Sequence, residues 1–215
     1  MSISPLSIPD IADVEVEEAK QVLRAAVREH RKQRSKRKLA ELAEVWVPTV
    51  MDFVGERELV ACYVSTNAEP STAFVLTALH DAGKRVLLPK LGPGLSRAWG
   101  YFEPGTELVN MAPGRPPEPE GEAFDNSILA GVDAMILPAL ALSRNGARLG
   151  QGGGWYDRAL KQTTPQAVVG AMIFADELLD VSIPQDDMDV RVPYAIFPTE
   201  IVPTEAAGQT FPQHL

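Results

Sequence analysis

The chain has 215 residues, of which 45% are hydrophobic and 23% are charged, which is enough for the core of one domain. Its formal net charge of −9 argues against nucleic acid or an anionic membrane as a general partner, so any anion site has to be local. The single cysteine, Cys62, excludes an intrachain disulfide framework. No apolar run reaches the roughly 18 residues that a membrane-spanning helix needs.

The first part of the chain predicts a leader followed by helix. Residues 1–15 are acidic and contain prolines, and we expect them to form a flexible leader. They lack the basic-then-apolar plan of a signal peptide, which makes the cytoplasm the expected location. Over 16–54, apolar side chains recur near the helical spacing. Pro48 is expected to mark a break or the start of a second helix.

The next stretch alternates predicted strands and helices. A strand over 58–64 leads through a turn into a helix over 71–82, which Gly83 ends. A strand then starts at residue 84, and we expect Pro89 to close it.

The rest of the chain continues the alternation, and the run DAMILPAL is apolar on both faces, as in the centre of a parallel sheet. We expect, in chain order, a turn over 91–95, a strand over 98–102, a long surface loop over 103–122, a strand over 132–140, a helix ending near Gln162, a strand over 167–174, at most one helical turn over 177–179, and a strand over 194–202. The pattern predicts an α/β fold with a mostly parallel sheet flanked by helices, in a Rossmann-like three-layer arrangement. One catalytic domain is expected over 16–205, with a tail over 206–215.

A glycine-rich loop follows the most apolar predicted strand, within the sequence LPALALSRNGARLGQGGGWYDRAL at 137–160. Glycines at 150, 152, 153 and 154 let the backbone approach another molecule and point its N–H groups at it. With the start of a helix behind it, such a loop can bind phosphate; a purely structural turn is the alternative. The loop matches neither the Walker loop nor the dinucleotide fingerprint.

Carboxylates and hydroxyls in three places are candidates to accompany this loop. Asp157, in the first turn of the following helix, could hold Mg²⁺ or could be a favourable charge at a helix start. The turn QDDMD at 185–189 could supply a second metal ligand or be a solvated acidic turn. Glu69 follows the first predicted strand, at the edge where ligands of such sheets bind. The hydroxyls of Thr66 and Ser71 beside it could contact a substrate or cap a helix.

Cations are concentrated in the first predicted helix. Lys20 and Arg24 are four residues apart and therefore share a helix face, where they could grip one phosphate chain or simply face solvent. The basic run over 24–38 could form a nucleic-acid patch, but no aromatic residues are interleaved in it. A solvated helix surface that assists capture of an anionic substrate is the preferred interpretation. The three histidines show no ligand spacing, which disfavours a zinc site and a Ser/His hydrolase.

Four blocks of this sequence resemble the 5-formyltetrahydrofolate cyclo-ligase family, also called 5,10-methenyltetrahydrofolate synthetase. The blocks are Lys20-x-x-Leu23-Arg24, Glu69-Pro70-x-Thr72, VLLPK at 86–90, and Asn145-Gly146-x-Arg148-Leu149-Gly150-x-Gly152-x-Gly154-x-Tyr156-Asp157-Arg158. They occur in the family's order and spacing, and the resemblance spans from about Lys20 to Val202. The last block is long and specific, and the other three support it.

The resemblance implies an ATP-dependent ligase that converts 5-formyltetrahydrofolate and ATP into 5,10-methenyltetrahydrofolate, ADP and phosphate, with Mg²⁺ as cofactor. The folate, with or without a polyglutamate tail, and ATP would be its partners, and the enzyme would act as a monomer without nucleic acid or membrane. The roles that the resemblance implies for individual residues fall into three groups. Lys20 and Arg24 would bind ATP phosphates, Lys20 and Arg148 would be catalytic, and the ATP loop would comprise Arg148, Leu149, Gly150, Gln151, Gly152, Gly153, Gly154, Trp155 and Tyr156. Asp157 and Asp187 would hold Mg²⁺, and Thr66, Glu69 and Ser71 would line the folate pocket.

The chain departs from the family at three of these places. Many relatives have Asp where this chain has Ser143, some have Glu where it has Ser71, and Tyr or Phe is usual where it has Trp155. Trp99 and Tyr101 are further candidates to pack on the folate rings, on chemistry alone. A non-catalytic folate- or nucleotide-binding paralogue is the alternative to an enzyme, and a nucleic-acid-binding protein is a third, less favoured hypothesis.

Overall fold

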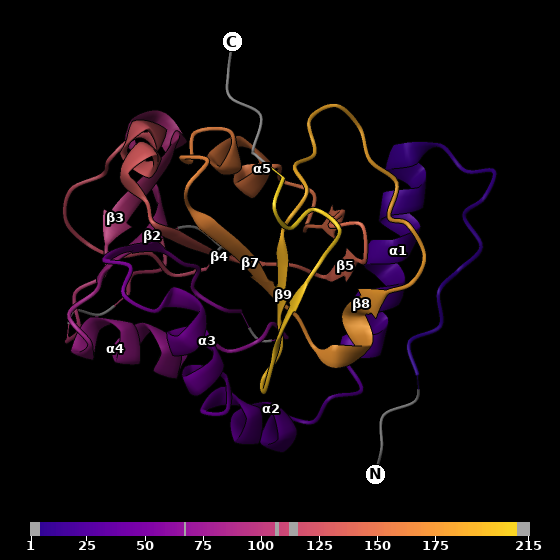
Figure 1. Ribbon diagram of the computed structural model, residues 1–215, viewed down its shortest axis with the longest axis horizontal. Helices are drawn as coiled ribbons and strands as arrows, with labels where there is room; N and C mark the ends of the chain where they lie inside the picture. The colour runs from indigo at the N-terminus through magenta and orange to yellow at the C-terminus, as the bar shows by residue number, and fades with distance from the viewer. Residues whose placement is uncertain (1–4, 67, 106–107, 112–115, 210–215) are drawn as a thin grey trace.

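A computed structural model describes residues 5–66, 68–105, 108–111 and 116–209 of the chain. Its centre is a seven-stranded sheet with the strand order β10-β9-β7-β4-β1-β2-β3. The five inner strands are parallel to one another, and the two edge strands, β10 and β3, are antiparallel to their neighbours. Helices lie on both faces of the sheet, and α1 stands beside it (Figure 1). The predicted α/β fold with a mostly parallel sheet is confirmed.

The elements follow one another along the chain in an alternating pattern. The helices are α1 (Val16–Arg31), α2 (Lys36–Ala43), α3 (Trp46–Val54), α4 (Ala73–Asp81) and α5 (Trp155–Leu160), with short 3₁₀ helices η1 (Pro93–Leu95), η2 (Asn126–Gly131) and η3 (Ala175–Glu177). The large sheet contains β1 (Leu59–Ala61), β2 (Arg85–Leu91), β3 (Arg97–Tyr101), β4 (Ala134–Pro138), β7 (Val168–Met172), β9 (Tyr194–Ile196) and β10 (Ile201–Pro203). A small sheet contains β5 (Ala141–Ser143), β6 (Arg148–Leu149) and β8 (Leu178–Leu179).

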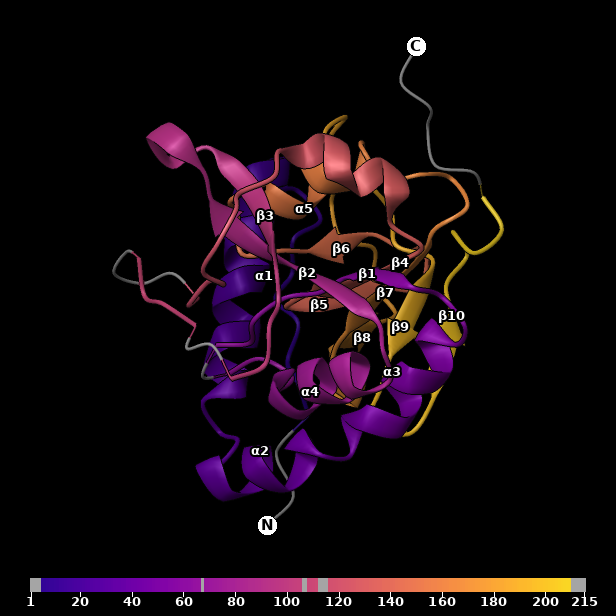
Figure 2. The same ribbon diagram turned by 90° about the vertical axis from the view of Figure 1, so that its left-hand side faces the viewer.

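Alternate side chains of the central strands bury against opposite layers, because successive side chains of a strand point to opposite faces. In β4, Ala134 and Ile136 pack against the layer of α3 and α4, whereas Met135 and Leu137 pack against the layer of α5 and η2. The edge-on view shows the two layers above and below the sheet (Figure 2). Burial on both faces explains why DAMILPAL carries no polar positions.

The small sheet forms a separate apolar layer with α1. Leu23 and Val27, one turn apart on α1, pack against Leu140 and Leu149 of the small-sheet region. Residues of the leader also contact this layer, through Leu6, Ile8 and Ile11. This packing fixes α1, and with it the cations on its neighbouring face, against the segment that contains the glycine loop.

The long helical region divides into three helices, and Pro48 marks the start of the third, as one of the two expected alternatives. Ser35 caps α2 by accepting a hydrogen bond from the Lys38 N–H at 3.2 Å. Pro48 lies in the first turn of α3. Backbone N–H groups in a first helical turn have no partner within the helix, so proline costs no hydrogen bond there.

Pro89 does not close its strand, contrary to expectation. It lies inside β2 and pairs with Trp99 of the antiparallel strand β3. The backbone N–H and carbonyl of Trp99 bond to Phe124 at 2.8 Å on the other side, so they point away from β2. Pro89 and Trp99 are therefore a non-hydrogen-bonded pair of the ladder, and the missing N–H of proline removes no bond from it.

Two expectations near the C-terminus also need correction. The strand expected over 194–202 is a hairpin of β9 and β10, closed where the Phe197 N–H donates to the Glu200 carbonyl at 2.9 Å. The helical turn expected over 177–179 begins earlier, as η3, and then extends into β8.

Gly170 allows β7 to pack closely against α3 and β9. A Cβ at this position would lie 2.7 Å from Ile196 Cδ1 and 2.8 Å from Phe53 Cζ. Gly170→Ala is therefore expected to lower the free energy of unfolding by about 1–3 kcal/mol through overpacking. Urea denaturation measures this change. Gly131→Ala is the control, because its Cβ would meet Leu59 Cδ2 at an ordinary 3.7 Å, and equal stability of the two variants would contradict the prediction.

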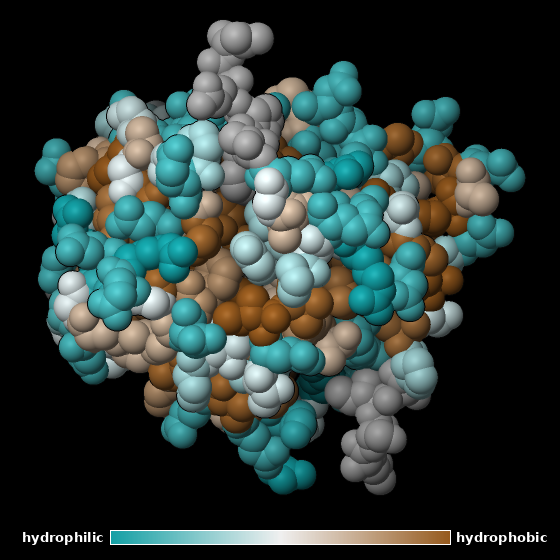
Figure 3. All heavy atoms as spheres, viewed as in Figure 1, coloured by the Kyte–Doolittle hydropathy of each residue, from teal (hydrophilic) through white to brown (hydrophobic). Residues whose placement is uncertain are grey.

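No helix among the residues described above is long and apolar enough to cross a membrane. On the face seen in Figure 3, hydrophilic side chains surround several smaller patches of hydrophobic ones.

Candidate functional site

A cavity of about 280 Å³ lies where α1, the glycine loop and the acidic turn at 185–189 meet. Pro138, the last residue of the central strand β4, and Ala139 after it form part of the cavity wall. The cavity is thus at the carboxyl edge of the parallel strands, where ligands of such sheets bind. Its charged lining residues are Glu17, Lys20, Arg24, Glu69, Arg148, Asp157, Arg158, Asp186 and Asp189.

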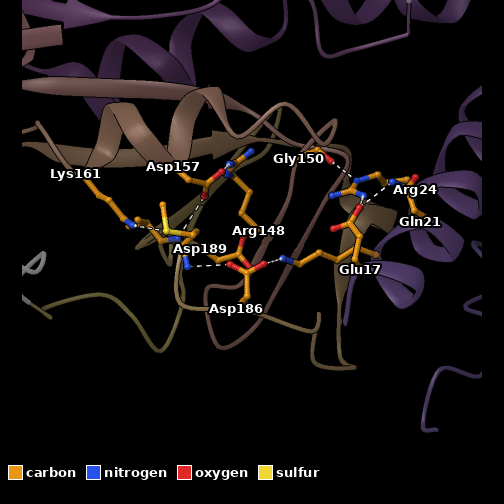
Figure 4. Close-up of polar contacts among 12 residues, drawn as sticks. Glu17, Gln21, Arg24, Arg148, Gly150, Asp157, Lys161, Asp186 and Asp189 are labelled. Atoms are coloured by element: carbon orange, nitrogen blue, oxygen red, sulfur yellow. Dashed lines mark hydrogen bonds and ion pairs between the residues drawn. The ribbon is translucent and has the colours of Figure 1, made fainter. Parts of the chain in front are cut away.

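Arg148 and Asp157 form a fixed ion pair within this cavity (Figure 4). Arg148 lies on β6, where its Nη2 donates to Asp157 Oδ2 at 2.7 Å. The other Asp157 oxygen accepts the Val190 N–H at 3.3 Å. Both side chains have little exposed area, at 4% and 15%. The pair sets the position of one cation and one carboxylate at the cavity wall.

Lys20 reaches across from α1 to the acidic turn. Its Nζ donates to Asp186 Oδ2 at 2.9 Å and also bonds to Asp189. Burial of the Lys20 side chain, which is 5% exposed, by itself lowers its pKa, but the bonds to the two carboxylates outweigh burial and raise the pKa. The same bond lowers the pKa of Asp186. Lys20 therefore remains a cation at neutral pH.

Arg24 lies one turn after Lys20 and binds the glycine loop. Its Nε donates to the Gly150 carbonyl at 3.0 Å, and its Nη1 donates to Glu17 Oε1 at 2.9 Å. Arg28 continues this contact by donating from Nη2 to Gln151 Oε1 at 2.8 Å. The spacing of Lys20 and Arg24 predicted that they share one face of α1. That face is directed at the glycine loop.

The glycines of the loop leave room for the guanidinium groups of neighbouring arginines. A Cβ at Gly150 would lie 2.6 Å from Arg148 Nη1, which is closer than real contacts. Gly152 has a φ of +103°, and Gly154 has a φ of +58°, values that a side chain disfavours. These glycines allow the loop to turn between Arg24 and Arg148 without moving either.

A second, larger and more apolar cavity of about 550 Å³ adjoins the first. Trp155 and Tyr156 contribute to both cavities, and Tyr63 lies in the wall of the second. Burial raises the pKa of Tyr156 well above its usual value, so its hydroxyl stays neutral. Arg97 lies over the Trp155 ring at 5.7 Å. The arrangement suits a ligand with flat rings and polar ends.

Several residues expected at the site line one of these cavities, and others do not. Glu69 lines both, while the Thr66 N–H and hydroxyl donate to Glu69 Oε2 at 2.9 and 3.0 Å and orient it. Thr66 and Ser71 are not among the residues that line either cavity. Trp99 is buried behind Trp155, with its Nε1 bonded to Asn126 Oδ1 at 2.9 Å.

In the acidic turn at 185–189, Asp187, the residue expected to hold Mg²⁺, does not line the cavity beside Lys20. Asp187 is exposed and lines a neighbouring cavity of about 300 Å³, whereas Asp186 and Asp189 face Lys20. The turn is held by the Asp186 N–H, which donates to Asp189 Oδ2 at 2.9 Å.

Glu17 lines the cavity but was not predicted as a site residue from the sequence. Its place seven residues before Arg24, two helical turns away on the same face, was the available signal.

Part of the basic run is buried, contrary to the expected solvated surface. Arg31, 2% exposed, donates to both oxygens of the fully buried Glu177 at 2.8 Å and to the Ala139 carbonyl at 2.7 Å. Arg34 bonds to Asp176 and lies over the Phe174 ring at 4.1 Å. Arg31 thus joins the end of α1 to η3 and to the residue after β4, and Arg34 joins the turn after α1 to η3.

Ser143 and Cys62, two other residues noted in the sequence, are both buried away from the site. Ser143 is buried, and its hydroxyl donates to Asn145 Oδ1 at 2.6 Å within the turn between β5 and β6. Burial raises the pKa of Cys62 to about 12, which leaves the thiol protonated and unreactive. Neither residue lines the two adjoining cavities.

The described part of the chain has no ready group of three or more His, Cys, Asp or Glu side chains that could hold a metal ion. Mg²⁺ commonly takes only one or two protein carboxylates, together with water and substrate phosphates. Asp157, Asp186 and Asp189 at the cavity are oxygen donors of the kind that fit this cation.

Comparisons with known proteins agree on one family. Residues 16–198 match the model of the 5-formyltetrahydrofolate cyclo-ligase family. The 5-formyltetrahydrofolate cyclo-ligase of Mycolicibacterium smegmatis is 37% identical over 144 residues, covering 65% of this chain and 73% of the relative. The enzyme of that name from Escherichia coli K12 is 31% identical over 144 residues, or 66% and 79% of the two chains. The NMR structure of Aquifex aeolicus 5,10-methenyltetrahydrofolate synthetase has the same fold, with a TM-score of 0.71 at 23% identity over 91% of this chain and 97% of that one.

Proposed function

This chain belongs to the 5-formyltetrahydrofolate cyclo-ligase family, and from that membership and the site geometry we propose that it cyclises 5-formyltetrahydrofolate to 5,10-methenyltetrahydrofolate with ATP and Mg²⁺. ADP and phosphate are the other products. The names of its relatives support the cyclisation, and the charge and shape of the site support the use of a nucleotide.

One observation carries the assignment of two substrates: two cavities of different character share a wall. The smaller contains Lys20, Arg24 and Arg148, which suits a triphosphate. The larger is apolar and aromatic, which suits the ring systems of a folate. Two molecules bound in these cavities would have their reacting ends next to each other beside Trp155 and Tyr156, which line both cavities.

The proposed reaction asks the protein for positioning and charge neutralisation. The formyl oxygen of the folate attacks the γ-phosphate of ATP, ADP leaves, and N10 then closes the ring as phosphate is released. Lys20 and Arg148 neutralise the charge that develops on the transferred phosphoryl group, and Arg24 holds the phosphate chain against the loop of Gly150–Gly154. The paired carboxylates keep these cations oriented before the nucleotide arrives.

The carboxylates are also candidate ligands for Mg²⁺, which would offset the negative charge of the nucleotide phosphates. Asp157 is the first candidate, because it lies at the cavity beside Arg148. Asp186 and Asp189 line the same cavity, so we favour them over Asp187 as the contribution of the acidic turn.

We assign a contact with the folate to Glu69, which lines both cavities and which Thr66 orients. Contacts of Thr66 and Ser71 with the folate, the monomeric state and the cytoplasmic location stay predictions.

The rise in near-ultraviolet absorbance as the methenyl product forms tests this proposal. Purified protein is expected to produce the rise with 5-formyltetrahydrofolate only when ATP and Mg²⁺ are both present. Omission of ATP, omission of Mg²⁺, and AMP in place of ATP are the controls. If folded protein gave no ATP-dependent rise but still bound the folate, the non-catalytic paralogue would be the better description.

A further inference from the structure

Glu17 is an acidic residue in a cavity to which we assign a polyanion. It lies in the first turn of α1 and lines the cavity together with Lys20 and Arg24. Its Oε1 accepts hydrogen bonds from Arg24 Nη1 at 2.9 Å and from Gln21 Nε2 at 2.8 Å. Figure 4 shows its carboxylate directed at the Arg24 guanidinium and away from the helix axis.

The two partners of this ion pair differ in how firmly they are held. The Arg24 side chain is 7% exposed and is fixed through Nε to the Gly150 carbonyl, so the guanidinium cannot leave the loop easily. Glu17 is 67% exposed. Arg24 and Gln21 lower the pKa of Glu17, so the carboxylate is charged at neutral pH. It can therefore move into solvent while Arg24 stays in place.

We propose that Glu17 competes with a phosphate group of the nucleotide for Arg24 and thereby weakens nucleotide binding. This inference rests on the proposed use of ATP at the same cavity. An anion that binds Arg24 has to displace Glu17 or lie beside its negative charge. Either route costs free energy that a neutral side chain at this position does not impose.

The size of the effect follows from the exposure of Glu17. Exposed ion pairs are weak, and their loss corresponds to about two- to fivefold in an equilibrium constant. Glu17→Gln keeps the length of the side chain and removes the charge. We expect this variant to bind a triphosphate about two- to fivefold more tightly than the wild type. The gain should shrink as salt is added, because salt screens exposed charges.

A purely structural role predicts a different result. A carboxylate in the first turn of a helix stabilises it through the helix dipole. Glu18 is the matched control, because it occupies the same first turn, is exposed, and is not among the residues lining the cavity. Glu18→Gln removes the same charge from the same helix end. An effect that depends only on the helix or on net charge would appear in both variants.

Isothermal titration calorimetry of the folded full-length protein tests the proposal, with ATP and inorganic tripolyphosphate as probes. Tripolyphosphate lacks the nucleoside, so it isolates the phosphate contacts. Tighter binding of both probes by the Glu17→Gln variant, with the Glu18→Gln variant like the wild type, is the expected result. Weaker or unchanged binding by Glu17→Gln, or the same gain in both variants, would overturn the inference. A wild type that binds neither probe would instead contradict the proposed nucleotide site itself.

Discussion

Replacing Arg31 with methionine is expected to lower the free energy of unfolding by about 3–5 kcal/mol, because the change leaves the buried carboxylate of Glu177 without its main partner. Arg31 bonds to both oxygens of Glu177, and neither side chain is more than 2% exposed. The change also removes the donor to the Ala139 carbonyl. Chemical denaturation followed by circular dichroism measures the loss.

The destabilisation should depend on pH. Burial raises the pKa of Glu177, and Arg31 opposes this rise, so removing Arg31 moves the pKa of the folded state higher still. The folded variant then binds a proton that the unfolded chain releases above its ordinary pKa of about 4.3. Its stability is therefore fullest below that pKa and is lost as the pH rises toward the folded-state pKa.

Two further variants test whether the loss of stability comes from the unpaired buried charge of Glu177 or from altered packing. Replacing both partners with methionine removes the unpaired charge, and buried ion pairs exchanged for apolar residues often keep their stability. We expect the double variant to recover much of the loss. Arg37→Met breaks an exposed pair with Glu41 and should change stability very little. A double variant as unstable as Arg31→Met alone would contradict the role given to the charge.

Replacing Lys20 with alanine is expected to lower kcat/KM for ATP by about 100- to 1,000-fold, a cost of the size found when one preorganised donor to developing negative charge is removed. Without Lys20, Asp186 and Asp189 face the phosphate chain with no cation between them. The KM for ATP should rise much more than the KM for the folate. Initial rates from the absorbance assay, with each substrate varied in turn, give both values.

Lys32→Ala is the matched control for this variant. Lys32 follows α1 and pairs with Glu29 at the surface, where both side chains are 72% exposed. Its loss removes one positive charge without touching the cavity and should leave both KM values near those of the wild type. Equal increases in the two KM values of Lys20→Ala would show that Lys20 does not act through the phosphates.

The sequence predicted the layers of the fold and one face of the site because both follow from periodicity. The apolar run of β4 indicated a buried parallel strand, and the four-residue spacing of Lys20 and Arg24 placed both on one helix face. The small sheet was missed because β6 and β8 contain only two residues each, too few for alternation to be recognised. Strands this short form because they pair with a neighbouring strand, here β5, and their own sequence pattern does not predict them.

The orientation of individual acidic residues and cations required the structure. Within QDDMD, local hydrogen bonds decide that Asp186 and Asp189 face Lys20 while Asp187 faces outward. Arg31 resembles its solvated neighbours in sequence, yet it is buried because Glu177 lies opposite it, 146 residues away in the chain. Contacts over such separations leave no local signal.

The two edges of the large sheet are also protected against pairing with another chain. On one edge, the backbone of Trp99 in β3 is already bonded to Phe124 on its outer side. On the other, β10 has only three residues and ends with Pro203, which has no N–H to donate. Short strands, proline and covering segments are the means by which proteins avoid edge-to-edge aggregation. Extension of the large sheet by a strand of another chain is therefore disfavoured at both of its described edges.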